Sequence, residues 1–209
     1  MNEHPTNGSS GLGGRLPLLP PDALDEAQCA LRDGLRATRV RGAEEAGYTV
    51  ALPDGRFIGP FNALLHTPHI ARPLLEWAQA LTRAGIPADV REVVILTVAA
   101  HWRAEYARYA HTAAAEKAGL PGPAIASLLH GEAPSGLRPD ADLAYRLAVA
   151  LVRDHRVPDG LYAEAVAAFG TNTLIALVNL VGQYLNTSAL LACFQVPAPS
   201  PEHTEASAS

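Results

Sequence analysis

The stretch at residues 88–119 constrains the fold more than any other part of the chain. Its first half is an apolar run with helical spacing, in which Val93, Leu96 and Ala100 form one stripe. Its second half is crowded with groups that transfer protons or bind carboxylates. A single straight helix of this length would be long for a globular domain. We therefore predict a break near residues 101–104.

The other periodic segments are also helical. They predict helices beginning at residue 22, over 68–85, 123–130, 140–155 and 159–169, and from 171 onward. Residues 48–52 are the one short segment that suits extended backbone, and no strand pattern has any strength. The sequence therefore predicts an all-α protein.

Composition and termini indicate one folded domain. The chain has 209 residues, of which 48% are hydrophobic, so it can bury a sizeable core. We expect residues 16–196 to form the domain, and we expect disordered tails at 1–15 and 197–209, which are rich in small and polar residues.

Several classes of function are disfavoured by what the sequence lacks. The net charge is −5 with no basic block, so we expect no nucleic-acid partner. There is no HxxxH, HExxH or CxxC pattern, no Gly-rich phosphate loop and no GxSxG elbow, so we expect neither a metal nor a cofactor.

The cellular setting is predicted to be cytoplasmic. The N-terminus lacks the apolar segment of a secretory signal, and Cys29 and Cys193 are far apart, which fits reduced thiols. The apolar run at residues 174–194 is interrupted by polar side chains, so we expect a buried helix and no membrane partner. The interrupting residues are Asn179, Gln183, Asn186, Thr187 and Ser188.

The candidate catalytic residues are His111, Glu92, Arg108 and Glu105. A histidine can both accept and return a proton near neutral pH, and an arginine is rarely buried without an anionic partner. Each has a simpler interpretation, except Arg108. Glu92 lies three residues after Asp89 and suits a helix-capping pair, His111 suits a core position, and Glu105 suits a surface pair with His101. Glu92 can reach His111 only if the helix breaks and folds back.

The candidate substrate-binding residues are mostly aromatic: Tyr106, Tyr109, Trp102, Phe61 and Asn62. The tyrosines and the tryptophan are equally interpretable as core aromatics. Small alanines beside His111 leave room for a cavity. Asn179, Gln183 and Asn186 form a polar stripe that lines either this cavity or a contact between helices or subunits.

Two segments carry a family resemblance: IGPFNALLHTPHIARPLLEWAQALTRAGIPADVREVVILTVAAHWRAEYARYAHTAAAEKAGL and LVGQYLNTSALLACFQVPAP. The most specific part is the order R-E-x-x-I-L-x-V-A-A, W-x-A-E-Y and then a histidine. The chain resembles the carboxymuconolactone decarboxylase family, within the alkylhydroperoxidase-like superfamily. The resemblance implies an alkylhydroperoxidase-like helical bundle that forms a homo-oligomer, commonly a trimer or hexamer, with sites near subunit contacts.

The resemblance also places the site. The redox branch of the superfamily uses a Cys-x-x-Cys pair, a histidine and a glutamate one helix earlier. These positions fall on Ala104, Ala107, His111 and Glu92. Without a thiol at the motif there is no thiolate nucleophile there. Many thiol-free relatives read AEYEWxxH, and here the E and W positions are Ala107 and Arg108.

We therefore expect a cofactor-free lyase, most simply a decarboxylase, acting on a small organic acid or lactone. Arg108 would hold negative charge, His111 would deliver the proton and Glu92 would orient it, with a tyrosine donating to a substrate oxygen. Phe61 and Asn62 would close the mouth of the pocket. The alternatives are a thiol-dependent peroxidase-type antioxidant protein and a non-catalytic ligand-binding protein of the same fold.

Overall fold

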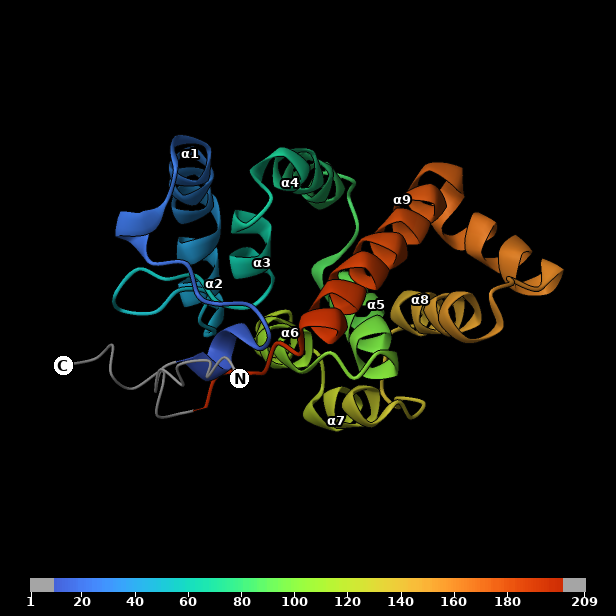
Figure 1. The fold of residues 1–209 in the computed structure, drawn as a ribbon. Helices are drawn as coiled ribbons and strands as arrows, with labels where there is room; N and C mark the ends of the chain where they lie inside the picture. Colours follow the sequence, from blue (N-terminus) through green and yellow to red (C-terminus); the bar gives the residue numbers. More distant parts are fainter. Residues whose placement is uncertain (1–9, 201–209) are drawn as a thin grey trace.

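The computed structural model describes residues 10–200, and almost all regular structure in that range is helical (Figure 1). The only β-structure among these residues is an isolated bridge between Ala51 and Phe57, so the predicted all-α class is confirmed. The α-helices are α1 (Glu26–Leu35), α2 (Arg41–Ala46), α3 (Pro60–Leu65), α4 (Pro68–Thr82), α5 (Ala88–His101), α6 (Glu105–Lys117), α7 (Gly122–His130), α8 (Pro139–Val149) and α9 (Asp159–Phe194). Shorter 3-10 or π segments are η1 (Ser10–Gly13), η2 (Pro21–Ala23), η3 (Arg36–Val40) and η4 (Ala150–Asp154).

Helix α5 is the centre of the structure. Most of its side chains are buried, as expected for a helix that is apolar on all sides. It contacts α6, α7, α8 and α9, and its valines, Ile95 and Leu96 form the main core with Leu147 of α8 and Leu177 of α9. This packing fixes the position of every residue that α5 contributes to a site.

The predicted break occurs directly after α5. Arg103 takes a left-handed conformation with φ of 52°, and the amide of Ala104 donates to the carbonyl of Ala99 at 2.9 Å. The amide of Arg103 also donates to Ala100, which completes a Schellman motif with arginine where glycine is usual. The reversal sends α6 back along α5, so residues far apart in the 88–119 stretch become neighbours.

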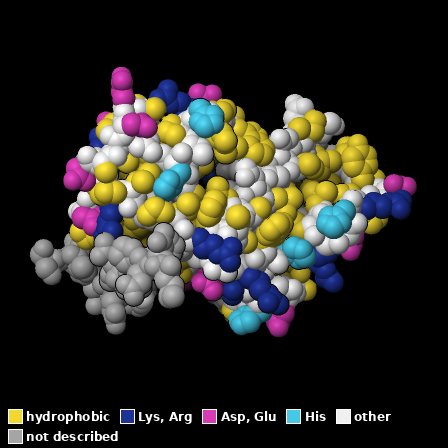
Figure 2. Space-filling view, in the orientation of Figure 1, with side chains coloured by type: hydrophobic (Ala, Val, Ile, Leu, Met, Phe, Trp, Pro, Cys, Tyr) yellow, Lys and Arg dark blue, Asp and Glu magenta, His cyan; other side chains and the backbone are white. Residues whose placement is uncertain are grey.

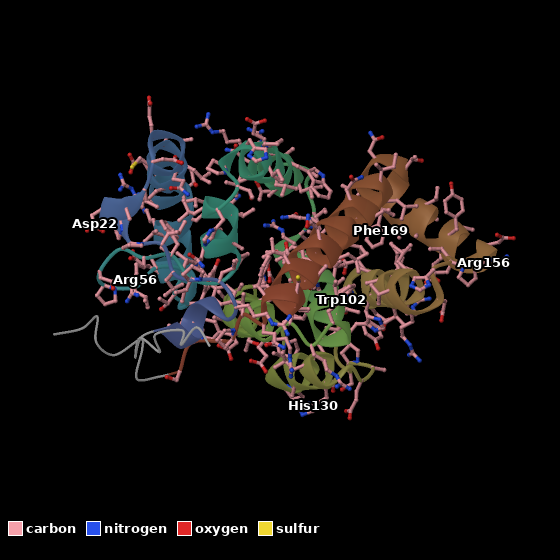
Figure 3. All side chains as sticks on the ribbon, viewed as in Figure 1. Asp22, Arg56, Trp102, His130, Arg156 and Phe169 are labelled. Carbon is pink, nitrogen blue, oxygen red and sulfur yellow. The ribbon has the colours of Figure 1, made fainter. Side chains whose placement is uncertain are left out.

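Two smaller clusters connect the N-terminal helices to this core. In one, Leu35, Phe57 and Leu65 pack between α1, α3 and α4. In the other, η1 and the end of α9 pack against α6. Side chains of α4 and of α9 extend into the space between these helices (Figure 3), and the cavity described below lies there.

Helix α9 is long and apolar enough, by length and composition, to cross a membrane. Gly170 interrupts it with non-helical backbone, at the position where the sequence predicted one helix to end and the next to begin. Leu174, Leu177 and Leu180 pack into the main core. One face of this helix therefore belongs to the core, whereas only 33% of its apolar 18-residue window is buried, so the predicted buried helix is confirmed for that face alone.

The N-terminal boundaries differ from the prediction. The first α-helix begins at Glu26 rather than residue 22, because Asp25 caps it through a reciprocal capping box with Gln28. Residues 10–15, which we expected in a disordered tail, pack against the C-terminal end of α9: Leu12 is buried, and Arg15 donates to the carbonyls of Phe194 and Cys193. The outer parts of both predicted tails, 1–9 and 201–209, lie outside the described residues.

The turn into α3 gives a stability prediction. Gly59 has φ of 63° and ψ of −148°, a conformation essentially restricted to glycine, and a Cβ there would overlap the ring of Tyr106. Gly59→Ala should lower the free energy of unfolding by about 3 kcal/mol in urea denaturation. Gly85→Ala is the matched control, because its φ is also positive but its Cβ would meet open space, and it should cost about 1 kcal/mol. Equal losses would contradict this account of the turn.

Candidate functional site

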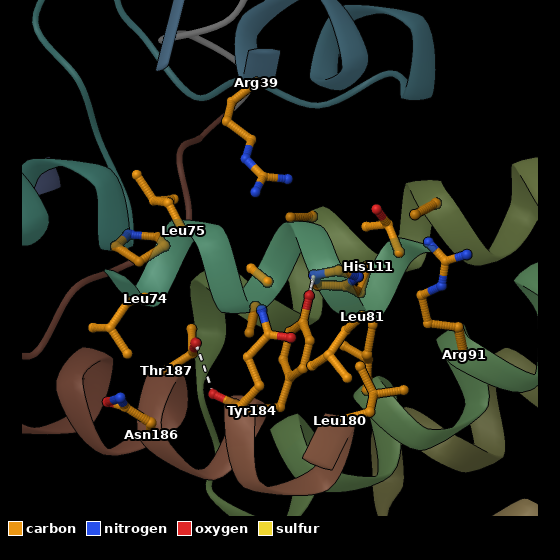
Figure 4. Close-up of a pocket in the computed structure, with 18 of the residues that line it drawn as sticks. Arg39, Leu74, Leu75, Leu81, Arg91, His111, Leu180, Tyr184, Asn186 and Thr187 are labelled. Carbon is orange, nitrogen blue, oxygen red and sulfur yellow. Dashed lines mark hydrogen bonds between the residues drawn. The ribbon is translucent and has the colours of Figure 1, made fainter. Parts of the chain in front are cut away.

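A cavity of about 300 Å³ lies between α4 on one side and α5, α6 and α9 on the other (Figure 4). This volume is at the small end of the range for small-molecule sites. Leucines and Trp77 of α4 form an apolar wall, and Ala107, Ala110 and Ala114 of α6 form a floor of small side chains. Its polar groups come from η3, α5, α6 and α9, so the cavity has an apolar side and a polar side.

Glu92 and His111 meet at the polar side. The carboxylate Oε2 of Glu92 lies 2.7 Å from Nδ1 of His111. Glu92 is 7% exposed on an otherwise apolar helix, where an unpartnered carboxylate would be costly. It makes no capping bond to the start of α5, and Asp89 instead pairs with Arg138. Glu92 therefore contacts the histidine and does not cap α5, while its catalytic role stays a prediction.

Tyr184 of α9 completes a line of three hydrogen-bonded groups. Its hydroxyl lies 2.9 Å from Nε2 of His111, and the two rings meet edge to face (Figure 4). An ionised carboxylate only accepts hydrogen bonds, so Nδ1 of a neutral His111 carries the hydrogen and Nε2 accepts from Tyr184. This arrangement, Glu92–His111–Tyr184, is named the relay below. Its tyrosine end lines the cavity.

The tyrosines around the relay are held in the protonated form. Burial, with a further contribution from the Glu92 carboxylate, raises the pKa of both Tyr48 and Tyr184, and for Tyr184 the rise is large. Burial likewise raises the pKa of Tyr106. Tyr184 is therefore a neutral hydrogen-bond donor at physiological pH and is unsuited to act as a phenolate nucleophile.

The structure brings several predicted residues together. Glu92, His111, Tyr106 and Phe61 all line the cavity. Of the polar stripe on the last helix, Gln183 and Asn186 line the cavity, whereas Asn179 is exposed and bonds to its own helix.

Arg108 and Glu105 do not reach the cavity. The guanidinium of Arg108 turns to α7 and donates to the carbonyl of Leu129 at 2.9 Å, so it does not lie in the cavity that Glu92 and His111 line. Glu105 is exposed in the first turn of α6.

Three predicted substrate-binding residues also lie elsewhere, each for a structural reason. Trp102, labelled in Figure 3, follows the end of α5 and is 40% exposed. The hydroxyl of Tyr109 accepts a hydrogen bond from the amide of Thr49, and the carbonyl of Thr49 accepts one from the hydroxyl of Tyr106. Tyr109 therefore holds the loop around Thr49 in place. Asn62 is buried and bonds to the backbone of Leu19 and Pro17. It anchors the N-terminal segment and does not close a pocket.

Sequence reasoning missed four residues of the site: Tyr184, Tyr48, Arg39 and Arg91. Two had a local signal, since Tyr184 follows Gln183 in the polar stripe and Arg91 precedes Glu92. Arg39 and Tyr48 lie in a segment without helical period in the sequence, and only the tertiary packing brings them to α5 and α9.

No cysteine or methionine lines the cavity, and Glu92 and His111 are the only carboxylate and histidine side chains in its lining. Ala104 and Ala107, which the family resemblance aligns with the cysteine pair of redox relatives, are both buried. Cys29 faces the carbonyl of Leu24, and Cys193 is exposed. Within residues 10–200 no cluster of three or more histidine, cysteine or carboxylate side chains could hold a metal ion.

Comparison with known proteins identifies the fold. A crystal structure from Ralstonia eutropha JMP134, described as an alkylhydroperoxidase AhpD core and an uncharacterized peroxidase-related protein, matches with a TM-score of 0.70. The match covers 96% of each chain at 16% sequence identity. No protein-family model and no curated protein sequence matches the chain. The fold is therefore alkylhydroperoxidase-like, as predicted, and membership of the carboxymuconolactone decarboxylase branch stays a prediction.

The raised pKa of Tyr184 affects the free energy of unfolding at high pH. A folded-state pKa above the ordinary value of 10.0 means that the unfolded chain loses this proton first. The free energy of unfolding should therefore fall as the pH rises above about 10. Tyr184→Phe should make this fall shallower in urea denaturation at a series of pH values. Tyr162→Phe, at a tyrosine that is 55% exposed, should keep the wild-type slope. An unchanged slope in Tyr184→Phe would contradict a protonated Tyr184.

Proposed function

We propose that the protein is a cofactor-free acid–base enzyme, most simply a decarboxylase-like lyase that acts on a small organic acid or lactone. The observation that carries this proposal is the relay, with Glu92 and Tyr184 bonded to opposite nitrogens of His111 and Tyr184 facing a small cavity. General acid–base catalysis needs a proton-transfer group within hydrogen-bond reach, held in one orientation. The two bonds to His111 supply that orientation.

The relay delivers a proton through Tyr184. When His111 carries a second proton, both ring nitrogens donate, and the Tyr184 hydroxyl hydrogen is free to point into the cavity. A substrate carboxylate leaves as CO2, and the electron pair of the broken carbon–carbon bond stays on the substrate as a carbanion or enolate. That carbon takes the Tyr184 hydrogen while Tyr184 takes the Nε2 proton of His111. Tyr184 never becomes a phenolate, which agrees with its raised pKa.

Glu92 holds the imidazole of this relay in place. Its carboxylate lies 2.7 Å from Nδ1 of His111 in a mostly buried setting and accepts the hydrogen on that nitrogen. His111 therefore presents Nε2 to the hydroxyl of Tyr184. In the lactone case the same relay would protonate or deprotonate the carbon beside the carbonyl.

A thiol peroxidase is the weaker alternative. Peroxide reduction by this fold would need a thiolate near the histidine. The two motif positions are alanines, and neither Cys29 nor Cys193 lines the cavity. The relay instead ends on a hydroxyl, which supports proton transfer.

The relay predicts a graded loss of turnover. His111→Asn should lower kcat about 100-fold or more on the substrates that the wild type converts, because the general acid is removed. Tyr184→Phe should also lower kcat, because the hydroxyl that passes the proton from His111 to the substrate is then absent. The assay is conversion of γ-carboxymuconolactone and a panel of β-keto and vinylogous acids, followed by NMR in deuterium oxide. One deuterium should appear on the carbon that loses CO2.

Two controls make the result specific. His101→Asn changes an exposed histidine of the same helical stretch and should leave kcat unchanged. Peroxide reduction, if any, should be equal in the wild type and in Cys29→Ser/Cys193→Ser; a loss would favour thiol chemistry. Robust turnover by His111→Asn would remove the histidine from its role, and ligand binding without turnover would favour the non-catalytic alternative.

We also propose that the protein is a homo-oligomer. Ile175 and Val178 are 55% and 44% exposed on one face of α9, and hydrophobic side chains gather over the α9 part of the surface in Figure 2. Light scattering should give a multiple of the chain mass, and Ile175→Glu should reduce it. Ala192→Glu, at an exposed position near the end of the same helix, is the control. A monomeric wild type would contradict this proposal.

A further inference from the structure

The cavity contains two guanidinium groups that the relay does not use. Arg39, from η3, and Arg91, from α5, both line it (Figure 4). Among residues 10–200 neither forms an ion pair with a carboxylate. Most arginine donors near a protein interior find an anionic partner, so two unpaired guanidiniums at one cavity indicate a negatively charged ligand.

Most of the guanidinium N–H groups of Arg91 have no hydrogen-bond acceptor among the described residues. Its Nη2 reaches the carbonyl of Ile86 at 3.5 Å, which is a long contact, and its buried Nε has no hydrogen-bond partner. Arg39 makes no hydrogen bond to another described residue through its side chain, and Figure 4 shows it extending toward the cavity from above. Each of the two side chains therefore has guanidinium donors available to an anionic oxygen.

Electrostatics places both charges near the relay. The positive charge of Arg39 acts on Tyr48 and Tyr184, and that of Arg91 acts on Tyr184, in each case against the rise in pKa that burial causes. The only carboxylate in the cavity lining is Glu92, which is bonded to His111. Two guanidiniums facing one carboxylate leave a net positive charge, which one anionic group would neutralise.

We propose that Arg39 and Arg91 form a clamp for a carboxylate, and that the ligand is a small organic acid with an apolar body. The carboxylate lies between the two guanidiniums. The body packs against the apolar wall of α4, which Leu74, Trp77 and Leu81 form. This inference rests on the proposed function, for which it names the substrate class.

The clamp also sets which bond of a substrate can break. A carboxylate paired with arginine is stabilised as an anion, so it resists loss as neutral CO2. A decarboxylated substrate would therefore be a diacid that keeps the clamped carboxylate, and its product would be a monoacid. Monoacids with an apolar body are then product-like ligands and suitable probes.

The probes are hexanoate, hexan-1-ol and acetate, titrated by calorimetry at neutral pH into the full-length protein. Hexanoate should bind more tightly than the alcohol, which has no charge, and than acetate, which has little apolar body. Arg39→Gln and Arg91→Gln should each weaken hexanoate binding about tenfold, because each removes charge-assisted hydrogen bonds. Hexan-1-ol binding should not change in either variant.

Two further arginines serve as controls. Arg36→Gln removes the same charge from an exposed position of the same segment and should leave hexanoate binding unchanged. Arg72 lines a neighbouring hollow between α1 and α4 that also includes Arg39. If Arg72→Gln weakens hexanoate as strongly as Arg91→Gln, the carboxylate lies in that outer hollow and the clamp is wrong. Equal binding of hexanoate and hexan-1-ol to the wild type would also overturn it.

Two measurements keep the test decisive. If Arg91→Gln does not fold, Arg91→Lys retains the charge without the fork and should still weaken hexanoate several-fold; unchanged binding overturns the clamp. Repeating the titration in His111→Asn separates the two proposals. Hexanoate binding retained there supports the clamp even if no acid is ever turned over, whereas a wild type that turns over acids but does not bind hexanoate refutes the clamp alone.

Discussion

The hydrogen bond between Glu92 and His111 is the contact on which the site depends, and it exists because the chain reverses between α5 and α6. Glu92 is buried on a helix whose other buried side chains are nearly all apolar, where a carboxylate without a partner would cost several kcal/mol. The left-handed residue Arg103 turns α6 back so that His111 meets this carboxylate at 2.7 Å. The local strain at one residue is thus coupled to the pairing of a buried charge.

The sequence predicted the fold well because the signals for helices and their ends lie within short segments of the chain. The apolar stripe of α5 and the length of the 88–119 stretch were enough to predict both a buried helix and its break. The end of a helix at Gly170 followed from glycine alone. The start of the first helix was misplaced because Asp22 and Asp25 are both acceptable caps, and only the partner Gln28 distinguishes them.

The site was less predictable, because its parts come from separate elements. Glu92 and His111 were identified through a family resemblance, and no spacing within one helix could show that they meet. Arg108 does not reach the cavity, although an arginine suits the predicted role. The sequence could not show the direction of its side chain, which bonds to α7, and two other arginines line the cavity. Arg39 reaches the site from η3, so its position depends on how the N-terminal helices pack over α5 and α9, which no local pattern records.

The same fold supports different chemistry when a few side chains change, and the function that we propose uses oxygen where redox relatives use sulfur. The family resemblance aligns Ala104 and Ala107 with the cysteine pair of those relatives; both alanines are buried, and Ala107 belongs to the floor of the cavity. Tyr184 then places a hydroxyl against the free nitrogen of His111. Burial raises the pKa of that hydroxyl, which suits the proton transfer that we propose and does not suit nucleophilic attack. In the complex that we propose, a ligand held by the apolar wall and the two arginines would present its reactive carbon to this hydroxyl.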